Sequence, residues 1–99
     1  MTTVALVVKL TAKPETRDEV AEFLAGAVEL ANAEEGTPVW FALRTDPSTF
    51  WIVDAFPGGA ERQAHLEGPI AAALLANADR LLASPPEINP AEVLASKTP

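Results

Sequence analysis

A β-hairpin is the feature of this sequence that most constrains its fold. The segments 39–44 (Val-Trp-Phe-Ala-Leu-Arg) and 50–56 (Phe-Trp-Ile-Val-Asp-Ala-Phe) are rich in aromatic and branched residues, which is typical of β-strands. The short polar segment between them contains Pro47 and has the composition of a turn. Because the hairpin holds both tryptophans and three of the four phenylalanines, we expect any chemistry of this protein to take place on or beside its sheet.

A strand and a helix are predicted before the hairpin. Residues 4–10 form an apolar run interrupted only by Lys9, which indicates a strand that is buried on both faces. Thr16 and Glu19 have the spacing of a capping box, and the apolar residues behind them recur at helical intervals. We therefore expect an amphipathic helix from about residue 17 to 34.

After the hairpin, the pattern predicts two helical segments and a last strand. Pro-Gly-Gly at 57–59 ends the hairpin, and residues 60–66 have the character of a short helical turn. A longer helix is expected over 69–83, since proline suits its first position and an apolar stripe follows. The segment 87–97 predicts a weaker last strand, with Pro90 at a bulge or at a sheet edge.

The order β-α-β-β-α-β predicts an α+β, ferredoxin-like fold in a single domain over residues 1–99. In this fold both helices pack on one face of an antiparallel sheet, and the other face of a lone sheet is normally polar. Here the strands 39–44 and 50–56 are apolar on both faces. We therefore expect a second copy of the chain to cover the free face, giving a homodimer whose sheets lie face to face.

Composition excludes several classes of partner. The net charge of −7 repels phosphate backbones and anionic membranes, so we expect neither nucleic acid nor a membrane surface as partner. The absence of cysteine and the single histidine argue against a metal site. The N-terminus lacks the features of a secretory signal, and the apolar runs are too short to span a bilayer. We therefore expect a cytoplasmic protein.

Several segments, in their order and spacing, resemble the antibiotic biosynthesis monooxygenase family, and its quinol-monooxygenase-like branch most closely. They are distributed over nearly the whole chain: 35–37 (Glu-Gly-Thr), 41–44 (Phe-Ala-Leu-Arg), 46–50 (Asp-Pro-Ser-Thr-Phe), 54–56 (Asp-Ala-Phe), 64–66 (Ala-His-Leu) and 84–88 (Ser-Pro-Pro-Glu-Ile). The resemblance implies a dimeric α/β barrel. For characterised members it also implies oxygenation of quinols or aromatic polyketides by O₂ without metal, flavin or haem. Because the family also contains isomerases, haem-degrading members and members of no known activity, the resemblance does not fix the reaction.

Cofactor-free oxygenation makes few demands on a protein. It must bind a flat aromatic molecule, help to remove a proton, stabilise the resulting anion and exclude water. We expect an apolar pocket with a few polar groups between the sheet and its two helices to meet these demands. Two alternatives stay open: a non-catalytic ligand-binding dimer of the same fold, and a cofactor-free isomerase of a small carbonyl metabolite.

Three polar residues are the catalytic candidates. His65 is the first candidate base, because its ordinary pKa lies near neutrality and the resembling family often has a histidine just before the second helix; a histidine without a role is the alternative. If the hairpin turn has an odd number of residues, Arg44 and Asp54 share a face as diagonal neighbours; with an even number they lie on opposite faces. We favour the odd turn because a charge on a covered face needs a partner. Arg44 would then stabilise a phenolate and Asp54 would orient it, unless the two form a structural ion pair or a dimer contact.

Aromatic and amide side chains are the candidates for substrate binding. The aromatic set consists of Trp40, Phe41, Phe50 and Trp51, which either stack on a flat substrate or belong to the core or the dimer interface. Trp40 is favoured among them because it shares the face of Arg44 in either register. Phe23 is expected in the core or the pocket wall, and Asn32 either donates to a substrate or lies at the surface near the helix end.

Overall fold

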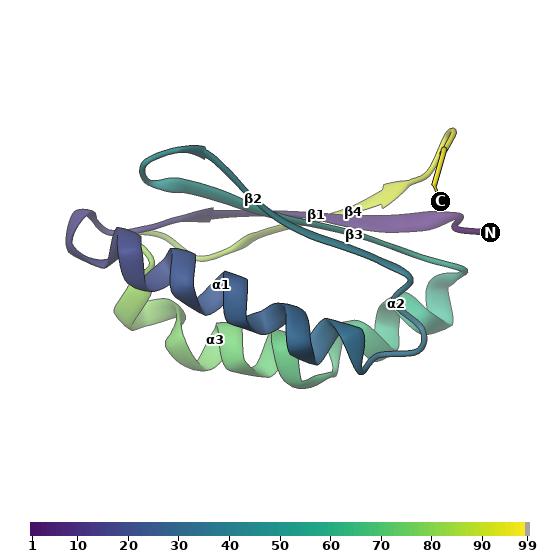
Figure 1. Cartoon of the computed structure of the whole chain (residues 1–99), viewed down its shortest axis with the longest axis horizontal. Helices are drawn as coiled ribbons and strands as arrows, with labels where there is room; N and C mark the ends of the chain where they lie inside the picture. Colours follow the sequence, from purple (N-terminus) through teal and green to yellow (C-terminus); the bar gives the residue numbers. More distant parts are fainter. Residues whose placement is uncertain (99) are drawn as a thin grey trace.

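A four-stranded antiparallel sheet forms one layer of the molecule (Figure 1). The structure, a computed structural model, describes residues 1–98. The strands are β1 (Val4–Thr11), β2 (Val39–Asp46), β3 (Thr49–Phe56) and β4 (Glu87–Glu92), in the order β2-β3-β1-β4. This is the predicted ferredoxin-like arrangement, with Pro90 on an edge strand. The last strand ends earlier than the sequence indicated, at Glu92.

The helices form the second layer, on one face of the sheet (Figure 1). They are a 3₁₀ turn (Pro14–Thr16), α1 (Arg17–Asn32), α2 (Gly59–Leu66) and α3 (Pro69–Leu81). The positions of α1, α2 and α3 follow the sequence pattern, although α1 ends before Glu34 and the 3₁₀ turn was not predicted. None of the helices within residues 1–98 has the length and apolarity that crossing a bilayer requires.

The register of the hairpin sets which side chains face the helices. Trp40 pairs with Asp54 and Arg44 pairs with Phe50, with an irregularity between Arg44 and Asp46. The prediction that these residues share one face is therefore confirmed, since directly opposed residues of an antiparallel pair lie on the same face. The prediction that Arg44 and Asp54 are diagonal neighbours is wrong. Arg44 lies beside the turn, whereas Asp54 lies near the other end of the hairpin.

The core lies between the two layers. Its largest members alternate along β1 and β3 and meet residues of α1 and α3: Leu6, Val8, Leu10, Phe50, Ile52, Phe56, Val20, Leu24, Leu74 and Leu81. The alternation corrects the expectation that the first strand is buried on both faces, because Ala5, Val7 and Lys9 are only half-buried. The opposite face of the sheet is also apolar. Phe41 is 56% exposed and Leu43 is 46% exposed on it.

The start of α1 differs from the predicted capping box. The Thr16 hydroxyl does not cap the helix; it donates instead to the carbonyl oxygen of Leu81 at 2.6 Å, in the buried space beneath the end of α3. Glu19 forms an exposed ion pair with Arg80. Both side chains therefore connect α1 to α3, and this long-range connection takes the place of the local cap.

We predict unequal effects for the two members of the supposed box. Thr16→Val keeps the shape but removes the buried hydrogen bond, and should lower the free energy of unfolding by about 1 kcal/mol. Glu19→Gln removes a surface ion pair and should cost about 0.5 kcal/mol or less. Urea denaturation of both variants measures the difference. Equal losses of unfolding free energy in the two variants would support the predicted capping box instead.

Candidate functional site

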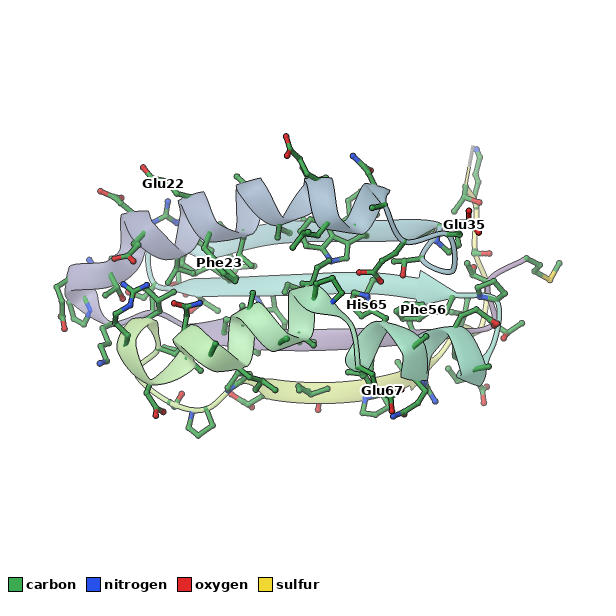
Figure 2. The ribbon with its side chains drawn as sticks, turned by 90° about the horizontal axis from the view of Figure 1, so that it is seen from below. Glu22, Phe23, Glu35, Phe56, His65 and Glu67 are labelled. Carbon is green, nitrogen blue, oxygen red and sulfur yellow. The ribbon has the colours of Figure 1, made fainter. Side chains whose placement is uncertain are left out.

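A buried histidine between two carboxylates forms the candidate site. His65 Nδ1 lies 2.6 Å from Glu34 Oε1, and His65 Nε2 lies 3.0 Å from Asp54 Oδ2. Figure 2 shows His65 directed from α2 into the space between the helices and the sheet, beside Phe56, whose ring centroid is 5.3 Å from that of the imidazole. The structure thus brings together two of the predicted residues, His65 and Asp54, with a third that was not predicted.

Three separate elements position these groups. Asp54 takes an inward position of β3, in the alternation that also buries Ile52 and Phe56. His65 lies in the last turn of α2. Glu34 follows the end of α1, and the Thr37 hydroxyl donates to Glu34 Oε1 at 3.0 Å, which fixes its carboxylate.

Burial makes the pairing energetically necessary. Asp54 is 1% exposed and His65 is 6% exposed, and an isolated charge at such positions is strongly unfavourable. Burial of the imidazole lowers the pKa of His65, but its contacts with the Asp54 and Glu34 carboxylates outweigh this effect, so the pKa is raised above its ordinary value of 6.5. The raised pKa favours an imidazolium ion between two carboxylates.

His65 separates two spaces of different character. The inner cavity, of about 30 Å³, is enclosed by Asp54, His65 and apolar side chains that include Ile52, Ile70 and Leu74. This volume admits a molecule the size of water but no aromatic ring. The outer hollow, of about 210 Å³, opens at the surface between Glu34, Glu61 and His65.

Four buried polar atoms at or near this site have no hydrogen-bond partner within residues 1–98. They are Glu34 Oε2, Trp40 Nε1 and the two carboxylate oxygens of Asp54, of which Oδ2 lies 3.0 Å from His65 Nε2 as an ion-pair contact. Trp40 and Asp54 are directly opposed residues of β2 and β3. A buried acceptor or donor of this kind is normally satisfied by protein, water or a ligand. The free oxygen of Asp54 is therefore available to accept a proton or a hydrogen bond.

Arg44 lies outside this site. Its Nη2 donates to the Pro47 carbonyl at 2.8 Å within the turn, and its guanidinium lies 4.9 Å from the centre of the Phe50 ring. Phe50 is core, buried to 2% exposure beneath that guanidinium. The predicted partnership of Arg44 with Asp54 fails because the register separates them along the hairpin.

The remaining predicted binding residues are dispersed. Phe41 and Trp51 lie on the free face of the sheet, so neither reaches a pocket under the helices; Trp51 Nε1 donates to Thr45 Oγ1 at 3.0 Å. Phe23 is half-buried on α1 at the margin of the core (Figure 2). Asn32 is exposed at the end of α1. Only Trp40 lies opposite a member of the site.

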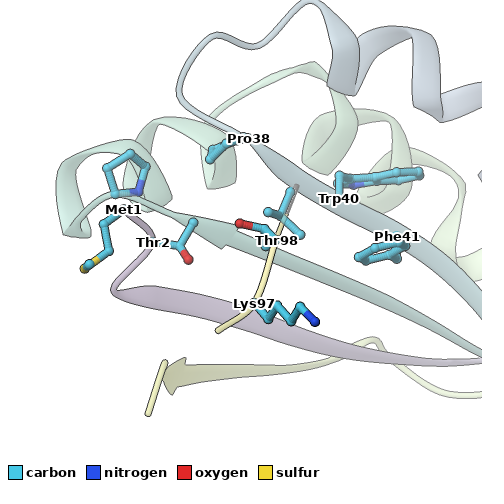
Figure 3. Close-up of a pocket in the computed structure, with 9 residues that line it drawn as sticks. Met1, Thr2, Pro38, Trp40, Phe41, Lys97 and Thr98 are labelled. Carbon is cyan, nitrogen blue, oxygen red and sulfur yellow. The ribbon is translucent and has the colours of Figure 1, made fainter. Parts of the chain in front are cut away.

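A larger hollow lies elsewhere on the molecule, at the start of β2 (Figure 3). It has a volume of about 560 Å³ and is lined by Pro38, Trp40 and Phe41 together with Lys97 and Thr98 of the C-terminal segment. Neither Asp54 nor His65 lines it. Its size suits a small molecule, and its titratable groups are Lys97 and the amino terminus of Met1 rather than the buried carboxylates and the histidine.

Glu34 is the residue that sequence reasoning missed. The helical pattern extended to residue 34 and offered no sign that the chain leaves the helix after Asn32 and turns its next acidic side chain inward. Within residues 1–98, no group of histidine and acidic side chains is arranged to hold a metal ion. At this site each ring nitrogen of His65 faces a carboxylate oxygen.

The fold is that of a known structural class. The chain shares its fold with solved structures provisionally named antibiotic biosynthesis monooxygenases, as the sequence resemblance predicted. One, from Nitrosomonas europaea, is 18% identical with a TM-score of 0.83, covering 93% of this chain and 99% of that one. Another, from Chloroflexus aurantiacus J-10-fl, is 22% identical with a TM-score of 0.75, covering 98% of each chain.

A solved structure with higher sequence identity to this chain shows which family the chain belongs to. The chain belongs to the same family as NE2512, a protein of unknown function from Nitrosomonas europaea. The two sequences are 58% identical, with a TM-score of 0.98, over 100% of this chain and 96% of that one. No family model and no curated protein matches the sequence.

We predict that His65 contributes pH-dependent stability. Because its pKa is raised in the folded state, this contribution is fully present below about pH 6.5 and is lost as the pH rises through the folded pKa. His65→Gln leaves two carboxylates without their cation and should cost about 3–5 kcal/mol near pH 6. The difference from wild type should shrink at alkaline pH.

Urea denaturation between about pH 5.5 and 9 measures this difference. Gln63→Ala, an exposed change on the same helix, is the matched control and should stay within about 0.5 kcal/mol of wild type. A difference between His65→Gln and wild type that does not vary with pH would show that the imidazole is not charged in the folded protein.

Proposed function

We propose that the protein is a cofactor-independent monooxygenase that oxidises a quinol or a polyketide-like aromatic with O₂. The observation that carries this proposal is the buried Asp54 carboxylate, which has one free oxygen and a histidine at the other. Such a group, facing a largely apolar cavity, is suited to removing a phenolic proton. The shared fold with structures named as antibiotic biosynthesis monooxygenases supports the same class.

In this proposal Asp54 replaces His65 as the base. Both ring nitrogens of His65 face carboxylate oxygens, so neither has a lone pair directed at a substrate. The O–H bond of the substrate breaks, its proton passes to Asp54 Oδ1, and the electron pair stays on the substrate oxygen. The imidazolium of His65 offsets the negative charge that forms beside it.

The remaining steps belong to the substrate and O₂. The anion gives one electron to O₂, and the resulting radical and superoxide combine through a new C–O bond to a peroxide. Cleavage of the O–O bond leaves one oxygen atom on the ring, and the other leaves as water after taking up the ring hydrogen and the proton held by Asp54. The ring carbon is oxidised, O₂ is reduced, and no outside reductant is consumed.

The substrate needs more room than the inner cavity offers. Small-molecule pockets usually span a few hundred Å³, whereas the inner cavity has about 30 Å³. An aromatic ring therefore reaches Asp54 only when apolar side chains such as Ile70 and Leu74 move. Both lie on α3, behind the break at Gly68 that separates α3 from α2.

Oxygen uptake tests the proposal. Wild type, without added metal or cofactor, should consume O₂ above the autoxidation blank with at least one member of a panel of hydroquinones and anthrones. Asp54→Asn should lower the rate by about 10²-fold or more, the usual contribution of a positioned base. Asp79→Asn, an exposed change on α3, should have no effect.

No uptake with any compound would reject the monooxygenase. Turnover of a carbonyl compound under strictly anaerobic conditions would then favour the isomerase, and binding without turnover would favour the ligand-binding dimer.

We also propose a homodimer formed through the free face of the sheet. Phe41 and Leu43 are exposed there beside half-buried Trp51 and Val53, and a contiguous apolar surface of this kind usually meets a partner. A second copy presents the same surface, so the contact is self-complementary. The cytoplasmic location expected from the sequence stays a prediction.

Sedimentation velocity tests the dimer. Wild type should sediment as a dimer, and Phe41→Asp should shift it to the monomer because a charge would be buried in the contact. Leu75→Asp is the matched control, because Leu75 is similarly exposed, at 60% against 56% for Phe41, but lies on α3. A wild-type monomer would contradict the proposal.

A further inference from the structure

The candidate site contains a single group that can be a cation. Of the described residues that line the inner cavity and the outer hollow, only His65 can carry a positive charge. The ionisable groups facing it are all acidic: Asp54 from β3, Glu34 and Glu35 from the segment after α1, and Glu61 from its own helix. An anion formed beside Asp54 therefore depends on the imidazolium for its stabilisation.

The Glu34 carboxylate is more buried and makes more contacts than a typical surface carboxylate. It is 17% exposed, and Oε1 contacts His65 Nδ1 at 2.6 Å while accepting the Thr37 hydroxyl at 3.0 Å. The segment that carries it lies close against α2. A Cβ at Gly36 would come within 3.2 Å of Glu61 Cγ, so glycine permits this approach.

We propose that Glu34 is the positioning residue of the site, holding the Nδ1–H of His65 so that the ring stays charged and keeps Nε2 directed at Asp54. The inference rests on the proposed function for its chemical consequence. Glu34 does not line the inner cavity, so it acts on a substrate there through His65. The imidazolium thereby takes the role that the sequence had suggested for Arg44, which lies at the hairpin turn.

The proposal predicts how activity depends on pH. If His65 must be protonated to stabilise the substrate anion, activity falls as the pH rises through its pKa. The Glu34 carboxylate is one of the two groups that raise this pKa. Without its charge, the ring loses its proton at lower pH, and the alkaline limit of activity moves down with it.

A single-histidine protein allows a direct test. The ring nitrogens of His65 are the only imidazole signals in a ¹⁵N NMR spectrum, so its titration needs no assignment. Glu34→Gln keeps the size of the side chain but removes the charge, and should lower the pKa of His65. Glu35→Gln is the matched control. Glu35 lines the outer hollow but has no contact with His65 among the described ion pairs and hydrogen bonds.

Oxygen uptake as a function of pH gives the second readout. The alkaline limit of activity should shift down in Glu34→Gln by the same amount as the His65 titration. An unchanged titration in Glu34→Gln would overturn the proposal. A shifted titration with an unmoved alkaline limit would overturn the role in stabilising the anion.

The test also gives an answer if no compound consumes O₂ or if the Glu34→Gln variant does not fold. If no compound consumes O₂, the proposed function fails, while the titration still decides whether Glu34 holds the charge of His65. If Glu34→Gln does not fold, Thr37→Val removes the hydroxyl that fixes Glu34 and should lower the pKa of His65 in the same direction. No shift in that variant would overturn the proposal.

Discussion

The contact between Asp54 and His65 is the constraint on which the rest of this structure depends. A carboxylate on an inward position of a central strand replaces an apolar side chain of the core, and the surrounding leucines and isoleucines cannot stabilise its charge. The fold supplies a cation from α2, and Glu34 then binds the other edge of that cation. This costly arrangement inside a small core is the reason we propose the chemistry at this group.

Much of the fold can be predicted from local patterns. The hairpin, the order of the strands and the placement of the helices on one face follow from residue periodicity and turn chemistry. The prediction that Arg44 and Asp54 share a face is also confirmed, although the turn has two residues and an irregularity beside Thr45 restores that face. The partner of Asp54 was misidentified. Asp54 needs a cation close by, and Arg44 shares its face, but the register leaves these two residues far apart along the strands.

The misses have a common physical cause, which is contact between residues distant in sequence. The Thr16 hydroxyl could cap the start of α1, but it donates instead to a carbonyl oxygen of α3. Glu34 has the spacing of a solvated helix residue, but the helix ends before it and the chain turns back towards α2. Neither result can be read from periodicity, because periodicity reports which face of an element is apolar and not which distant polar group that face meets.

The attachment of α2 has a consequence for the rigidity of the molecule. A helix as short as Gly59–Leu66 is not stable in isolation and depends on what holds it to the sheet. Besides apolar packing, its polar attachments to the sheet are His65 and the Arg62 guanidinium, which donates to carbonyl oxygens of Ala5 and Ala91 at 3.3 Å. Deprotonation of one imidazole therefore weakens the docking of a whole element. Loss of this proton therefore favours local opening of the segment nearest the buried carboxylate, at a lower free energy than global unfolding requires.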